Sequence, residues 1–162
     1  MELIFGTIAA LLPIINPFST APMFISLTEG YSNAERNNQA KKGVIYMTCI
    51  LLVFLIAGTF IMNFFGLSLP GMRIAGGILV SGVGMGMLKP KDSEHTDAER
   101  AEAVAKRDIS FTPLAMPSLS GPGAISVVIG MSSVAKGALM DYVYIALGIL
   151  VVAAIVYLTL RS

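Results

Sequence analysis

Several residue types are scarce in this chain. It has no tryptophan, one cysteine (Cys49) and one histidine (His95), and only 13% of its residues are charged. A lone cysteine excludes a disulfide framework within the chain, and a histidine without another histidine or cysteine nearby does not complete a metal site. The formal net charge of +1 offers no basic surface for nucleic acid. The sequence therefore does not predict a disulfide-rich secreted domain, a metal centre or a nucleic-acid partner.

Hydrophobic residues are abundant instead and make up 55% of the 162 positions. A water-soluble core of this size cannot bury so much apolar surface, so the composition predicts a protein of the lipid bilayer. A spanning helix needs about 20 apolar residues to cross about 30 Å of hydrocarbon. Five stretches meet this requirement: 3–27, 43–65, 71–88, 111–134 and 142–160. The sequence predicts an all-α, multi-pass membrane protein.

The second and fifth stretches carry large apolar residues on most faces, and we expect them to face lipid. Ser32 and Glu35 have the spacing of a capping box, which predicts a helix start just before the second stretch.

Basic residues are distributed unevenly between the predicted loops. Placing the N-terminus outside puts nine of the eleven basic residues inside, the arrangement favoured by the positive-inside rule. The nine are Arg36, Lys41, Lys42, Lys89, Lys91, Arg100, Lys106, Arg107 and Arg161, and the other two are Arg73 and Lys136. The sequence therefore predicts the inner (cytoplasmic) membrane with the N-terminus outside.

Six of the eight prolines form an internal repeat. Pro13, Pro17 and Pro22 in the first stretch recur 100 positions later in the fourth. The later set is Pro113, Pro117 and Pro122. Neighbouring residues match at the same offset, among them Ile25 with Ile125 and Gly30 with Gly130. This pattern indicates a duplication.

Three predicted spans separate the two copies, so the second copy enters the membrane from the opposite side. Inverted repeats of this kind build many secondary transporters. We expect a 3+3 architecture with a first repeat over 1–88, a cytoplasmic connecting loop over 89–110 and a second repeat over 111–162. The partner of the span that begins near Pro70 would begin near position 170. We therefore expect a missing sixth span, supplied by the rest of the same protein or by a second chain; a natural five-span protein is the alternative.

The repeated prolines predict breaks in the first and fourth spans. A proline lacks an N–H and frees the carbonyl four residues earlier, and membrane-depth carbonyls must be satisfied by protein or by a water-lined cavity. The carbonyls are those of Pro13, Phe18, Pro113 and Ser118. The predicted substrate-binding residues flank them: Asn16, Pro17, Ser19, Thr20 and Pro22 in the first span, and Pro117, Ser118, Ser120, Gly121, Pro122 and Gly123 in the fourth. The alternative is a pair of kinks whose polar residues only join helices.

No Asp, Glu, Lys or His lies in the middle third of any predicted span. Such a site offers dipoles without fixed charge and suits a small zwitterion, and the same carbonyls can bind Na⁺. The coupling ion is H⁺ or Na⁺, and we expect no other cofactor. Arg73 either extends to the outer interface or takes part in gating. Without an acid–base pair or metal cluster at membrane depth, we do not expect an enzyme.

Four ordered motifs resemble the MarC family over nearly the whole chain. They are Asn16-Pro17-Phe18, the run from Ser32 to Asn37, the run from Pro70 to Gly77, and Pro113 to Pro117 continuing to Ser120 to Gly123. That family is similar in organisation to the LysE-type exporters, with six spans in two inverted halves. The resemblance implies a transporter of small neutral amino acids of the glycine and alanine type, working by alternating access around two proline-broken helices. An ion or small-solute channel, or an exporter of other small zwitterionic metabolites, is the alternative.

Overall fold

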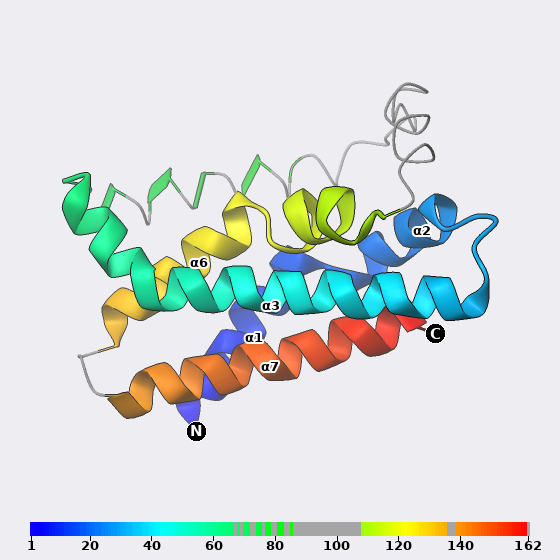
Figure 1. The fold of residues 1–162 in the computed structure, drawn as a ribbon. Coiled ribbons are helices and arrows are strands. Elements are labelled where there is room, and N and C mark those ends of the chain that lie inside the picture. Colours follow the sequence, from blue (N-terminus) through cyan, green and yellow to red (C-terminus); the bar gives the residue numbers. More distant parts are fainter. Residues whose placement is uncertain are drawn as a thin grey trace.

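The computed structural model describes residues 1–66, 108–135 and 139–161, together with single positions between 68 and 85. Every element in this part of the chain is a helix, which confirms the predicted all-α class (Figure 1). In chain order the elements are α1 (Glu2–Ile15), α2 (Pro17–Leu27), α3 (Asn33–Phe64), η1 (Ser110–Leu119), α6 (Pro122–Val134) and α7 (Leu139–Arg161).

The first predicted span is broken at Asn16, where α1 ends and α2 begins at an angle of 44°. Asn16 has a left-handed backbone, with φ 41° and ψ 70°. Asparagine tolerates this conformation better than most residues, and Pro17 cannot donate the N–H that would continue α1. Pro13 and Pro22 lie inside α1 and α2. One proline of the three therefore marks the break.

Two helices in the described ranges are long and apolar enough to cross a bilayer. They are Asn33–Gly58 within α3 and Leu139–Arg161, which is α7, and the bent pair α1–α2 makes a third span if it is counted as one. The predicted capping box is present at the start of α3: the Glu35 N–H donates to the Ser32 hydroxyl, and the Ser32 N–H donates to the Glu35 carboxylate. The predicted fourth span is two shorter helices, η1 and α6. Most of the predicted third span lies outside the described residues.

The long helices α3 and α7 form the centre of the packing, so the expectation that both face lipid was wrong for one side of each. α7 packs against α1, α2 and α3, and α3 packs against η1, α6 and α7. Buried residues recur every three or four positions along one face of each helix: Ala40, Val44, Met47, Leu51 and Leu55 on α3, and Ile145, Ile149, Val152, Val156 and Leu160 on α7. Other faces expose large apolar side chains such as Ile56 and Leu158. In a bilayer both faces are apolar, so composition alone does not identify the buried one.

Each broken span packs along the long helix of the other predicted repeat. α1 lies against α7, while η1 and α6 lie against α3. The Tyr157 hydroxyl at the end of α7 donates to Asn37 Oδ1 near the start of α3 at 2.9 Å, so these two helices run in opposite directions. Figure 1 shows the same arrangement, with the start of α3 and the end of α7 at one side of the molecule. The opposed directions are those an inverted repeat would require.

Glycines allow the broken spans to approach the long helices closely. A Cβ on Gly148 of α7 would lie 2.6 Å from Thr7 Cβ and 3.2 Å from the Ile4 carbonyl oxygen of α1. A Cβ on Gly58 of α3 would lie 2.8 Å from Ile129 Cγ1 of α6. Real Cβ atoms essentially never lie under 3.0 Å from such atoms, so small residues set the distance between these helices.

Gly148→Ala should therefore destabilise the protein. The new methyl group meets Thr7, whose hydroxyl is bonded to the Leu3 carbonyl at 2.7 Å and whose side chain is fully buried. Overpacking of this kind costs about 1–3 kcal/mol. Thermal unfolding of the purified protein in detergent measures the change. Gly6→Ala is the matched control, because nothing lies within 4 Å of its added Cβ; equal loss of stability in both variants would contradict the close contact.

Candidate functional site

At the first break, backbone and side-chain groups of Asn16 cap the start of α2. Asn16 Oδ1 accepts the N–H of Ser19 at 3.3 Å, and the Asn16 carbonyl accepts the Thr20 hydroxyl at 3.3 Å. Asn16 is half-buried and Thr20 is buried, whereas Ser19 is exposed. The break is thus a capped turn between two helices, with a polar residue on its inner side.

The second break has a different geometry. The element η1 is kinked and is not one regular helix; it contains wide turns in which N–H groups bond to carbonyls five residues back, as from Leu114 to Ile109 and from Ser120 to Ala115. Thr112 and Met116 have extended backbone angles within it. α6 then begins at Pro122, and Gly121 is its N-cap. Wide turns of this kind occur frequently at functional sites.

Serine hydroxyls satisfy backbone carbonyls in this wide helix. Ser118 Oγ donates to the Pro113 carbonyl at 2.8 Å, and Ser120 Oγ donates to the Ala115 carbonyl at 2.6 Å. The Pro113 carbonyl, which Pro117 was expected to free from its helical partner, is thus satisfied by a side chain of the protein. The five-residue spacing of the wide helix brings each hydroxyl over the carbonyl, a geometry that a regular α-helix does not provide. Both hydroxyl oxygens keep acceptor capacity after donating their hydrogen.

The two broken spans pack against each other in exchanged halves. The segment before the first break, α1, packs on the segment after the second, α6; likewise α2 packs on η1. We call this region of contact the crossing. There Ser118 Oγ lies 3.8 Å from Met23 Sδ, which joins α2 to the end of η1.

Apolar side chains pack around this crossing. Leu11 and Ile15 of α1, Phe24 of α2 and Leu119 of η1 are each no more than 2% exposed. They belong to one buried cluster that also contains Ala124 of α6. Apolar side chains therefore pack beside the polar groups of the two breaks.

The predicted site residues divide into two groups. Those at least half-buried near the crossing are Asn16, Pro17, Thr20, Ser118, Ser120, Gly121 and Gly123. Ser19, Pro22 and Pro122 are exposed, as is the Phe18 side chain. Arg73 and the side chain of Pro117 lie outside the described residues.

Met23 was not among the predicted site residues. Its position in the repeat corresponds to that of Gly123, which was predicted, so the 100-residue offset contained a signal for it. Reasoning from polar residue types alone passes over a thioether, although methionine sulfur accepts weak hydrogen bonds.

The whole chain, residues 1–162, matches the MarC family of integral membrane proteins. The chain belongs to this family. The inner membrane protein MarC of Salmonella paratyphi A is 38% identical over 166 residues, which cover 96% of this chain and 75% of the relative. MarC of Salmonella typhimurium gives the same identity and coverage. MarC of Escherichia coli O1:K1 / APEC is 39% identical over 135 residues, covering 80% of this chain and 61% of that protein. No solved structure matches the chain.

Membership of the MarC family confirms the resemblance carried by the four sequence motifs. The relatives are named inner membrane proteins, and the described helices are long and apolar enough for a bilayer. This is therefore a membrane protein of the MarC family with two or three candidate spans in its described part.

The crossing can be tested with a pair of cysteines. In a Cys49→Ser background, Met23→Cys with Ser118→Cys should be joined by a short bifunctional thiol cross-linker, because the native Met23 sulfur and Ser118 oxygen atoms lie 3.8 Å apart. Mobility on a non-reducing gel after cleavage between the two positions reads out the cross-link. Ile25→Cys with Ser118→Cys is the matched control, since Ile25 is exposed and lies on the other side of α2 from Met23. Equal cross-linking of both pairs would count against the contact.

Proposed function

We propose that this MarC-family protein transports small neutral amino acids across the inner membrane by alternating access. The observation that carries the proposal is the packing of two broken helices against each other in exchanged halves. Secondary transporters with inverted repeats bind substrate at such discontinuous helices. The opposite directions of α3 and α7, and the exchange of packing between the predicted repeats, support the inverted architecture on which alternating access depends.

The polar groups at the breaks suit a zwitterion. α2 begins at Pro17 and α6 begins at Pro122, so the N-terminal ends of two helices lie at the breaks. Helix N-termini favour a carboxylate, because their N–H groups carry partial positive charge. The hydroxyl oxygen of Ser118 and the amide oxygen of Asn16 are acceptors that suit an ammonium group. Binding by both kinds of group would select a molecule that carries both charges.

Charge and packing favour a small, neutral substrate. Glu2, at the very start of α1, is the one charged residue in α1, α2, η1 and α6 together. A substrate with net charge would therefore find no counter-ion at the breaks in these four helices, and a charge without a partner in a membrane is costly. The close packing of Leu11, Ile15 and Leu119 leaves the large side chains of leucine or phenylalanine less favoured than those of glycine or alanine.

A channel for ions or small solutes is the second candidate. It would need a continuous polar path, but apolar side chains no more than 2% exposed surround the crossing. A transporter in a closed state agrees better with this packing.

For the coupling ion, backbone and hydroxyl oxygens at the breaks suit Na⁺, whereas proton coupling usually needs a titratable group at membrane depth. Export of other small zwitterionic metabolites would use the same site.

Asn16→Gly tests the site without disturbing the turn. Glycine adopts the left-handed backbone of Asn16 freely, whereas alanine there costs about 1–2 kcal/mol and also loses the cap. Asn16→Gly should reduce uptake of labelled glycine or alanine into liposomes at least about ten-fold while unfolding close to the wild-type temperature, if one lost hydrogen bond to a charged group removes about 1.5–3 kcal/mol.

Asn16→Ala, by contrast, should lower both stability and transport. Asn38→Ala is the control, because Asn38 is an exposed asparagine on α3. Unchanged uptake by folded Asn16→Gly protein would rule out an amide contact with the substrate. No uptake of any neutral amino acid by the wild-type full-length protein would overturn the proposed function itself.

A further inference from the structure

The described basic side chains gather at one end of the molecule. Arg36, Lys41 and Lys42 lie near the start of α3, and Arg161 ends α7. The Tyr157–Asn37 hydrogen bond places the end of α7 beside the start of α3, so these four residues share one end of the helix bundle. We call it the basic end.

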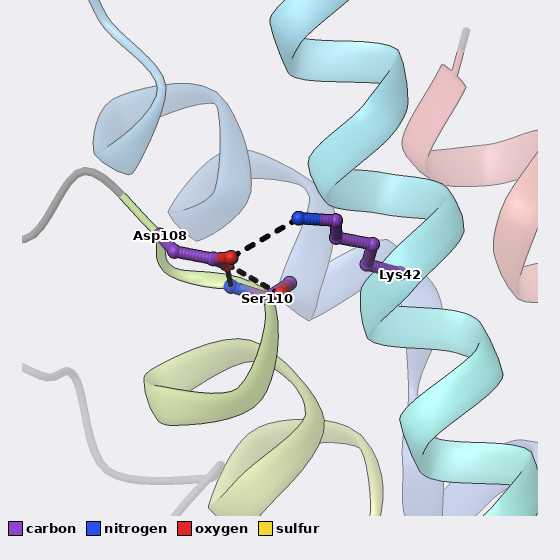
Figure 2. Close-up of polar contacts among 3 residues, drawn as sticks. All are labelled: Lys42, Asp108 and Ser110. Carbon is purple, nitrogen blue, oxygen red and sulfur yellow. Dashed lines mark hydrogen bonds and ion pairs between the residues drawn. The ribbon is translucent and has the colours of Figure 1, made fainter.

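Asp108 is held at the basic end by two elements. Its Oδ2 lies 3.2 Å from Lys42 Nζ on α3, and its Oδ1 accepts the N–H of Ser110 at 3.0 Å and also the Ser110 hydroxyl (Figure 2). These hydrogen bonds from Ser110 lower the pKa of Asp108, and the ammonium group of Lys42 lowers it further. The carboxylate is therefore charged at neutral pH. The Asp108 side chain therefore contacts both the start of η1, through Ser110, and α3, through Lys42.

The ion pair joins the two predicted repeats. Lys42 belongs to the first, and Asp108 directly precedes η1 of the second. The Tyr157–Asn37 hydrogen bond also joins the repeats at this end. At the opposite end, the Tyr142 hydroxyl donates to the Ser132 carbonyl at 3.4 Å, but that contact joins α6 and α7 of one repeat. The polar contacts between repeats thus favour closure of the basic end.

We propose that the Lys42–Asp108 ion pair is a latch that closes the basic end and breaks when the site opens there. The proposal rests on the proposed transport function, because a latch is needed only where the site opens alternately to each side. Both side chains are partly exposed, at 41% and 53%. An exposed pair is weak, so its loss should shift the closed-to-open ratio by at most about five-fold. A latch must be weak if transport is to proceed.

Two neutral variants separate the ion pair from the hydrogen bonds between Asp108 and Ser110. Lys42→Met removes the ammonium group and keeps an unbranched side chain of similar length. Asp108→Asn removes the charge but retains an oxygen that can accept the N–H and hydroxyl of Ser110. Lys42→Arg keeps the charge and should behave as wild type. Lys41→Met is the matched control, since Lys41 is an adjacent exposed lysine for which the described residues show no ion pair.

Labelling of a cysteine at the crossing reads out the opening. In the full-length protein with Cys49→Ser, Ser118→Cys is exposed to a membrane-impermeant maleimide in inside-out and in right-side-out vesicles. Lys42→Met and Asp108→Asn should each speed labelling from the side of the basic end, by up to about five-fold. Their combination should be no faster than either alone, because both remove the same interaction. Met23→Cys is a second reporter at the same crossing if Ser118→Cys does not fold.

Unchanged labelling in both neutral variants, or an equal increase in Lys41→Met, would overturn the latch. The labelling needs no transported substrate, so the outcome is separate from the uptake assay. Faster labelling without uptake of any neutral amino acid would support the latch and refute the proposed substrate. Uptake of a neutral amino acid, together with a labelling rate that does not depend on the ion pair, would refute the latch but not the proposed function.

Discussion

Inside a bilayer, a helix that proline interrupts must satisfy its freed backbone groups from within the protein, because no water is available to do so. The two breaks of this chain meet that requirement in different ways. At Asn16 a left-handed turn ends one helix and caps the next. At η1 the helix widens, and the hydroxyls of Ser118 and Ser120 bond to carbonyls five residues earlier. The breaks therefore depend on these polar residues, which satisfy the freed backbone groups.

The same constraint explains why the two broken spans pack together. Polar groups that face lipid are costly, so two broken helices are most stable when each covers the break of the other. The contacts between α1 and α6 and between α2 and η1 achieve this. The long helices α3 and α7 pack against the same segments. The Lys42–Asp108 pair lies beyond the apolar packing, where water can solvate both side chains. Its weakness follows from that position.

Sequence reasoning located the breaks because proline acts locally. A missing N–H is a property of one residue, and Pro17 and Pro122 each begin a new helix as expected. It did not distinguish them from Pro13, which lies within α1, because the outcome depends on which neighbours can satisfy the freed group. The hydroxyl partner of the Pro113 carbonyl was also missed, since it arises only from the wide turn. The predicted third span and Arg73 lie outside the described residues, and the roles of the site residues stay predictions.

Packing faces were harder to predict than breaks. In water, a polar face identifies the side of a helix that is not buried, but α3 and α7 are apolar on the lipid side as well as the buried side. A glycine in a long apolar helix indicates the close approach of another helix. The packed faces were therefore marked in the sequence by Gly43, Gly58 and Gly148. The contact between Met23 and Ser118 required knowledge of the crossing itself.

The exchange of partners between the two predicted repeats has a consequence for biogenesis. Thr7 is made near the beginning of synthesis, yet the surface that Gly148 offers it emerges from the ribosome about 140 residues later. Until then α1 has no α7 to pack against, and the polar turn at Asn16 has no η1 or α6 to cover it. The first half must therefore wait in the membrane, or beside the insertion machinery, as an incompletely packed intermediate. The contacts of α1 with α7, and of α3 with η1 and α6, can form only after the second predicted repeat has been made.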